Sequence, residues 1–79
     1  MTIPELARRY HIDTFFSEED GCWVANVPDL QYCSAFGDTP EQAGREIKIA
    51  MELWLEGWME DHPQPPPIRF VPDRMAEAG

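Results

Sequence analysis

Apolar and polar residues alternate from Tyr10 to Phe16, so one side of an extended chain would carry aromatic and β-branched residues. This period of two predicts a β-strand. The polar segment 17–21 ends in glycine and predicts a hairpin turn. Strands are also expected over 22–27, where Pro28 ends the strand, and over 32–36. The three strands should form an antiparallel meander.

The clearest local signal is the start of a helix. Thr39 fits the N-cap, Pro40 the first helical position, and Gln42 the reciprocal partner of a capping box. Apolar residues then recur at spacings of three and four, which predicts an amphipathic helix as far as about Asp61. The expected apolar stripe consists of Ala43, Ile47, Ala50, Trp54 and Trp58. This stripe should cover one face of the sheet.

Further apolar residues lie outside that stripe on the same expected helix. Ile49 and Leu53 lie to one side of it, and Leu55 and Met59 lie to the other. Two interpretations stay open at this point. The residues either widen the core face of a small domain, or form a second contact surface for a sister subunit or a partner.

The proline-rich segment 63–67 ends the helix, because proline cannot continue it, and should be extended. It is either a stiff connector back to the sheet or, through its P-x-x-P spacing, a ligand for a proline-binding module. A short fourth strand at a sheet edge is expected over Ile68–Val71, with a polar tail over 72–79. The order β-β-β-α-β predicts an α+β fold, in a single domain over residues 1–79, with the helix on one face of the sheet.

Charge narrows the classes of function. The 15 acidic and 6 basic residues give a formal net charge of −9. Nucleic acid and anionic lipid should be repelled, and the few basic residues are scattered along the sequence, so direct binding to either is not expected. A basic partner protein fits this charge, although the charge also serves solubility. A small core favours association of copies into an oligomer.

Cysteine content and hydropathy bear on location. Two cysteines without a signal-like leader predict free thiols in the cytoplasm. No apolar run approaches the roughly 18 residues that a membrane helix requires.

Residues that carry chemistry form no recognised pattern. The four soft metal ligands lack the spacings of a zinc site: His11, His62, Cys22 and Cys33. Nothing places His11 beside a thiol, as nucleophilic catalysis would need. Three carboxylates on separate elements are candidates for a magnesium-dependent nuclease site: Asp13, Glu46 and Asp73. In so acidic a chain each is more simply a solvated charge, so no cofactor, metal or catalytic residue is expected.

Three segments together resemble the HicB family of antitoxins. They read Val-Pro-Asp-Leu at 27–30, Cys-Ser-Ala-Phe-Gly-Asp-Thr-Pro-Glu-Gln-Ala at 33–43 and Ala-Met-Glu-Leu-Trp-Leu at 50–55. The family pattern is a hairpin followed by "PDLPGC", "GDTPEEA" and a helix ending near "A-x-x-x-W-L", then a proline-containing exit. The likeness covers residues 10–71. Gln31-Tyr32 stands where the family has Pro-Gly, so this turn should differ and Tyr32 should be an exposed contact.

The resemblance implies a partly degraded RNase H-like fold whose nuclease site is lost. It also implies a dimer or tetramer that neutralises a small basic RNA-cleaving toxin of the HicA type. Many members carry a C-terminal DNA-binding domain, whereas only residues 72–79 follow the last expected strand here, so no such domain is expected.

The expected mechanism is steric and electrostatic: carboxylates pair with the toxin's basic RNA-binding residues, and an apolar patch covers its catalytic residue. The expected partner contacts are Glu18, Glu19, Asp20, Asp29 and Tyr32. The expected oligomer or partner contacts on the helix are Ile49, Leu53, Leu55 and Met59. Two alternatives stay open: an orphan oligomeric adaptor with another partner, and a vestigial metal-dependent nuclease.

Overall fold

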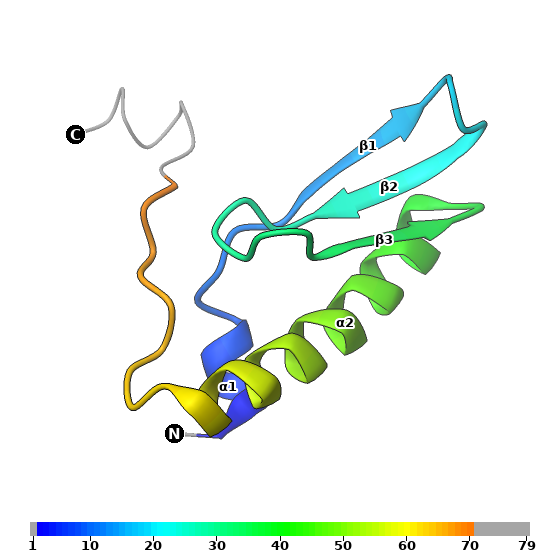
Figure 1. Cartoon of the computed structure of the whole chain (residues 1–79). Helices are drawn as coiled ribbons and strands as arrows, with labels where there is room; N and C mark the ends of the chain where they lie inside the picture. The colour runs from blue at the N-terminus through cyan, green and yellow to red at the C-terminus, as the bar shows by residue number, and fades with distance from the viewer. Residues whose placement is uncertain (1, 71–79) are drawn as a thin grey trace.

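The expected three-stranded meander and long helix both form in the computed structural model, which describes residues 2–70. Figure 1 shows the sheet as one layer and the long helix as the second. The elements in chain order are α1 (Ile3–Ala7), β1 (Asp13–Ser17), β2 (Cys22–Asn26), β3 (Ser34–Gly37) and α2 (Pro40–Asp61). The predicted α+β fold class is therefore confirmed.

The two faces of the sheet differ in what covers them. The antiparallel strands pair in the order β1-β2-β3, with Phe15 opposite Val24 and Val24 opposite Phe36. Because side chains alternate along a strand, these three residues share the outer face, while Ala25 and Ala35 lie on the inner face. Ala25 is fully buried and Ala35 nearly so, because α2 packs on this face.

The buried row of α2 consists of residues four apart: Ala43, Ile47, Met51 and Leu55. This row differs from the expected stripe, in which Ala50, Trp54 and Trp58 were central but prove only half-buried. Each indole N–H needs an acceptor, which keeps both tryptophans at the edge of the core. Trp54 Nε1 donates to the carbonyl oxygen of Gln31 at 3.2 Å, and Trp58 Nε1 to that of Gln64 at 2.8 Å.

The first turn of α2 is capped nearly as expected. The N-cap residue Thr39 accepts a hydrogen bond through Oγ1 from the backbone N–H of Gln42 at 3.0 Å. The Gln42 side chain reaches back to the N–H of Asp38, at 2.7 Å, instead of that of Thr39. The capping box is thus displaced by one residue at its second bond, and both bonds still tie the end of β3 to α2.

An additional helix, α1, forms before the first strand, where no element was predicted from the sequence. Thr2 caps it through a complete capping box with Glu5. The Thr2 hydroxyl lies 2.7 Å from a Glu5 carboxylate oxygen, and this hydrogen bond lowers the pKa of Glu5. Leu6 and Ala7 are buried in the core cluster with α2. The helix has only five residues, too few to show a helical period in the sequence.

The expected fourth strand is wrong for the residues that the structure describes. Ile68, Arg69 and Phe70 pair with no strand, and Val71 and the tail 72–79 lie outside the described residues. The Asp29 carboxylate provides the reason, because its Oδ1 accepts the backbone N–H groups of Arg69 and Phe70, each at 3.0 Å. These donors would otherwise have been free to pair with a strand.

Gly37 makes the closest approach between the sheet and α2. A Cβ atom at this position would lie 2.5 Å from the backbone nitrogen of Ala43 and 2.9 Å from Gln42 Cβ. A backbone atom cannot move aside as a flexible side chain can. Glycine is therefore required where β3 turns into α2.

We predict that Gly37→Ala destabilises the fold by about 2 kcal/mol or more, since the added methyl group forces the strand and helix apart. Gly57→Ala is the matched control, because a Cβ at Gly57 meets nothing within 4 Å and α2 should gain up to about 1 kcal/mol in helix propensity. Urea denaturation of both variants measures the difference. Equal stability of the two would contradict the close approach.

Candidate functional site

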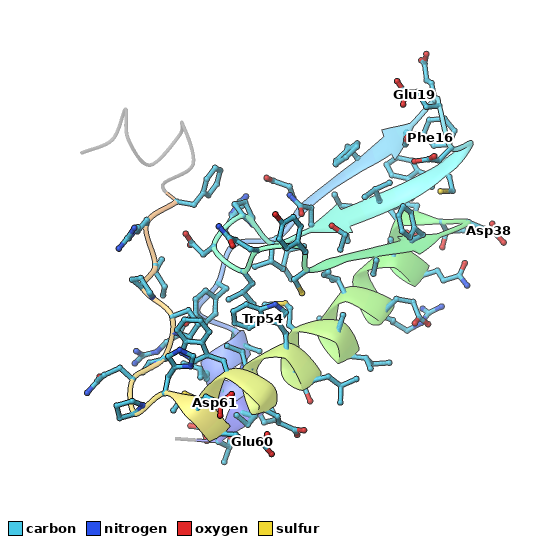
Figure 2. All side chains as sticks on the ribbon, viewed as in Figure 1. Phe16, Glu19, Asp38, Trp54, Glu60 and Asp61 are labelled. Carbon is cyan, nitrogen blue, oxygen red and sulfur yellow. The ribbon has the colours of Figure 1, made fainter. Side chains whose placement is uncertain are left out.

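The expected partner-binding residues fall at opposite ends of the sheet. Glu18, Glu19 and Asp20 lie in the β1–β2 turn, whereas Asp29 and Tyr32 lie in the β2–β3 connection. Figure 2 shows Glu19 at the tip of the hairpin, far from Trp54 near the other connection. A five-residue strand separates the two ends by about 17 Å. The structure thus does not bring the five residues into one patch.

The hairpin tip is acidic and exposed. Asp20 is held within the turn, since Ser17 Oγ donates to its carboxylate at 3.1 Å and accepts its N–H at 3.3 Å. Gly21 has φ 66°, a left-handed conformation that glycine adopts without strain. Glu18 and Glu19 project into solvent.

Asp29 holds a distant part of the chain through its carboxylate. Its carboxylate is half-buried, and Oδ1 accepts the N–H groups of Arg69 and Phe70. Its other oxygen, Oδ2, is buried without a hydrogen-bond partner among residues 2–70. The carboxylate is thus engaged within the chain, and its expected contact with a partner stays a prediction.

Residues 62–70, which we call the exit segment, are held at two further points. Tyr10 donates its hydroxyl to the carbonyl oxygen of Pro66 at 2.6 Å, and Trp58 Nε1 donates to that of Gln64. Pro66 is buried, and the Phe70 ring lies 4.8 Å from the His11 ring. These contacts favour the connector interpretation of the prolines.

Tyr32 is the most exposed large apolar residue in the described chain, at 99%. Its φ is 63°, in the left-handed region that suits the glycine of the family pattern and is uncommon for an aromatic residue. The turn stays tight, with hydrogen bonds of 3.1 Å from Leu30 N to Val27 O and from Cys33 N to Leu30 O. A strained, fully exposed aromatic side chain costs stability and has no packing role.

Three rings stack along one edge of α2 beside this turn. The ring centroids of Trp54 and Trp58 are 5.4 Å apart, and those of Trp58 and His62 are 3.7 Å apart, both pairs nearly parallel. The hydrogen bond from Trp54 to the Gln31 carbonyl places Tyr32 next to the stack. The stack thus lies beside the turn that carries Tyr32.

Ile49 and Leu53 are 57% and 63% exposed on the outward side of α2. They form the centre of a surface that we call the α2 outer surface, whereas Trp54 and Trp58 lie about 100–180° from them around the helix. Four carboxylates on the rim of this surface, at helical spacings from Leu53, are Glu46, Glu56, Glu60 and Asp61. An apolar centre with a charged rim is the usual anatomy of a protein interface.

The acidic end of α2 is electrostatically unfavourable. Glu60 and Asp61 lie in the last turn, which contains no basic residue, and Figure 2 shows both at that end of the helix. The helix dipole already makes this end negative, so each carboxylate costs about 0.3–1 kcal/mol. Two carboxylates thus lie at the negative end of α2, close in sequence to Trp58.

Leu55 and Met59, expected as surface contacts, belong to the core side of α2. Leu55 is fully buried, and Met59 is partly buried against the core cluster. Met59, Ile3 and Leu6 line one shallow cavity, so α1 covers this side of α2. Because α1 was not predicted from the sequence, no element was expected to cover Leu55 and Met59.

The candidate nuclease carboxylates do not converge. Asp13 lies on the outer face of the sheet, 2.7 Å from His11 Nε2, and Glu46 lies on the α2 outer surface, on the other side of the domain. Asp73 lies outside the described residues. Within residues 2–70, no three His, Cys, Asp or Glu side chains are grouped to hold a metal ion.

The two thiols are free, with Cys22 half-buried and Cys33 buried. Burial raises the pKa of Cys33, which disfavours its reactive thiolate form. In the described part of the chain, no helix is long and apolar enough to cross a membrane.

Comparison with known proteins gives no match for this chain among protein-family models, curated proteins or solved structures.

We predict that Tyr10→Phe destabilises the protein by about 1–2 kcal/mol at neutral pH, because the buried Pro66 carbonyl loses its donor. Burial, and secondarily the charge of Asp29, raise the pKa of Tyr10 above 10. The stabilisation is therefore complete below pH 10 and is lost as pH rises through the higher native pKa. Urea midpoints from pH 7 to 11 should converge for the wild type and Tyr10→Phe. The control Tyr32→Phe, at an exposed ring, should leave the midpoint unchanged.

Proposed function

We propose that this protein is a binding module for a small basic protein, which docks on the α2 outer surface. The observation that carries the proposal is the position of Glu60 and Asp61 at the negative end of α2, beside the Trp58 stack. The strained Tyr32 lies beside this stack, in the turn whose Gln31 carbonyl accepts the Trp54 hydrogen bond. Features that cost a fold stability tend to mark functional surfaces.

The net charge of −9 supports a basic occupant, because complementary charge speeds encounter and selects the partner. In the proposed complex, rim carboxylates pair with Lys and Arg of the partner. The ridge of Ile49 and Leu53 is buried at the centre, where contacts contribute most to affinity.

The resemblance of the Pro-Asp-Leu and Gly-Asp-Thr-Pro-Glu segments to HicB antitoxins makes an RNA-cleaving toxin of the HicA type our proposed partner. Neutralisation requires only that the module cover basic residues with which the toxin holds RNA. The cytoplasm is the proposed location, since such a toxin acts on RNA there. The resemblance-based RNase H-like ancestry is part of the same proposal.

We also propose that copies associate through the outer face of the sheet. Phe15 and Phe36 are 49% and 56% exposed there, on either side of Val24. Asp13 is the one carboxylate among the strand residues of this face. Two chains of charge −9 repel each other, so a self-association surface must be poor in charge. This oligomer is also what an orphan adaptor would require.

We predict that Glu60→Lys/Asp61→Lys abolishes capture of the basic partner while stabilising the fold by about 0.5–1 kcal/mol, since cations suit a helix C-terminus. The measurement is a pull-down from native cytoplasm with tagged protein, analysed by mass spectrometry at low and high salt. Wild-type protein should recover a small basic protein, and less of it at high salt.

The matched control is Glu18→Lys/Glu19→Lys, which makes the same change in net charge at the hairpin tip. It should retain the partner. Loss of the partner with the tip variant alone would move the site to the hairpin. Recovery of no basic protein by the wild type would overturn the proposed function.

For the oligomer, we predict that Phe36→Ser reduces the molar mass measured by light scattering from that of a dimer or tetramer to that of a monomer. The substituted side chain is already half exposed, so the fold should persist. Leu53→Ser is the control on the other surface and should leave the oligomer intact. A wild-type monomer at high protein concentration would contradict this proposal.

A further inference from the structure

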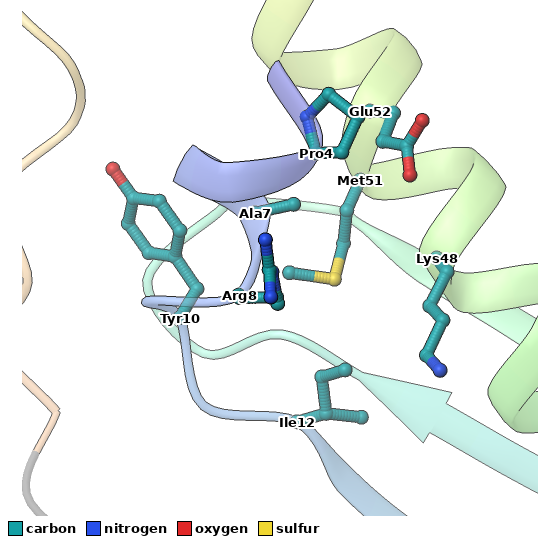
Figure 3. Close-up of a pocket in the computed structure, with 8 residues that line it drawn as sticks. All are labelled: Pro4, Ala7, Arg8, Tyr10, Ile12, Lys48, Met51 and Glu52. Atoms are coloured by element: carbon teal, nitrogen blue, oxygen red, sulfur yellow. The ribbon is translucent and has the colours of Figure 1, made fainter. Parts of the chain in front are cut away.

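An open cavity of about 410 Å³ lies between α1, α2 and the chain that leads into β1. Figure 3 shows Met51 and Ile12 facing it from two sides, with Ala7 of α1 nearby. Met51 and Ala7 are buried and Ile12 is half-buried, so the floor is apolar. This volume is within the range of small-ligand sites, which combine an apolar lining with a few polar groups.

Two cations reach the cavity from different elements. Arg8 follows α1 as its C-cap residue, and Lys48 lies on α2; both line the cavity (Figure 3). The sequence suggested scattered basic residues, but folding brings these two to one site. In the part of the chain that the structure describes, the one ion pair within 4.0 Å is that of His11 and Asp13. Neither cation is thus neutralised by direct contact, despite 15 acidic residues in the chain.

Glu52 also lines this cavity. Arg8, Lys48 and Glu52 together give the cavity a net charge of +1, which matches a ligand with a single negative charge. A dianionic phosphate or a polyanion would meet repulsion from Glu52 as well as from the acidic chain as a whole. An apolar body is needed in addition, because exposed ion pairs alone contribute little affinity.

We propose that this cavity binds a small amphipathic carboxylate, with its head between Arg8 and Lys48 and its hydrocarbon part against Met51 and Ile12. The guanidinium group of Arg8 suits a carboxylate, because it can donate two parallel hydrogen bonds. The site lies on another side of α2 from the centre of the outer surface, since Lys48 lies about 100° from Ile49 and about 140° from Leu53 around the helix. A bound carboxylate would therefore leave the proposed protein-binding surface free.

The test uses the full chain and octanoate as the probe, with isothermal titration calorimetry and mapping of amide shifts by NMR. A ligand of this size should bind with a Kd of about 1 mM. Octanol supplies the chain without the charge, acetate the charge without the chain, and octyl phosphate a dianionic head. Each should bind at least about tenfold more weakly than octanoate.

Arg8→Gln and Lys48→Gln should each weaken octanoate about tenfold, and the shifted amides should be those around Met51. Arg9→Gln is the matched control, because Arg9 is adjacent and exposed but does not line this cavity. Circular dichroism checks that all three variants fold. Equal binding of octanol, an equal loss with Arg9→Gln, or no saturable binding below roughly 10 mM would overturn the proposal. Tighter binding of octyl phosphate or of single-stranded RNA would assign the cations to phosphate instead.

Discussion

The close packing of α2 on a sheet face of small residues is the interaction on which the rest of the structure depends. Ala25 and Ala35 on the sheet meet Ala43 on the helix, so the two layers approach closely. Ile47, Met51 and Leu55 are then buried almost completely, each contributing about 1.5–3 kcal/mol. Burial of this row sets the orientation of α2 on the sheet. Helical geometry then determines that Ile49 and Leu53 point outwards and which side of the helix α1 covers.

Much of this arrangement could be predicted from local signals, and the errors on α2 share one cause. The Thr39-Pro40 start, the helix end at Asp61 and the period-two strands depend on neighbouring residues, which a sequence displays. The missed α1 explains the misplaced stripe. The buried row of α2 advances four residues at a time, so its direction rotates by about 40° around the helix with each step. Helix α1 covers the side of α2 towards which the row rotates. Leu55 and Met59 therefore entered the core, and the two tryptophans moved to its edge.

The functional surfaces were predicted less well, because they depend on contacts between distant segments. The motif containing Asp29 was evident, but its role was not, since its partners at Arg69 and Phe70 come 40 and 41 positions later. Those two hydrogen bonds also replace the expected fourth strand. Likewise, the proximity of Arg8 and Lys48 is a product of tertiary structure. The exposure of Tyr32 and of the hairpin-tip residues was expected from the sequence, whereas for Ile49 and Leu53 the structure decides between the two open interpretations.

Charge is distributed along the length of α2. Both of its cations, Arg45 and Lys48, lie in the first half of the helix, whereas Glu56, Glu60 and Asp61 lie in its last part. A helix selected for stability alone would have cations in its last turn and acidic residues in its first. Here Glu41 follows that rule in the first turn, and the last turn breaks it. The general excess of acidic residues in the chain therefore does not explain the carboxylates of the last turn, because the same charges at the N-terminal end would stabilise the helix. A cationic partner bound at the last turn would remove the unfavourable interaction of Glu60 and Asp61 with the helix dipole. The free energy gained in this way would add to the affinity of the complex.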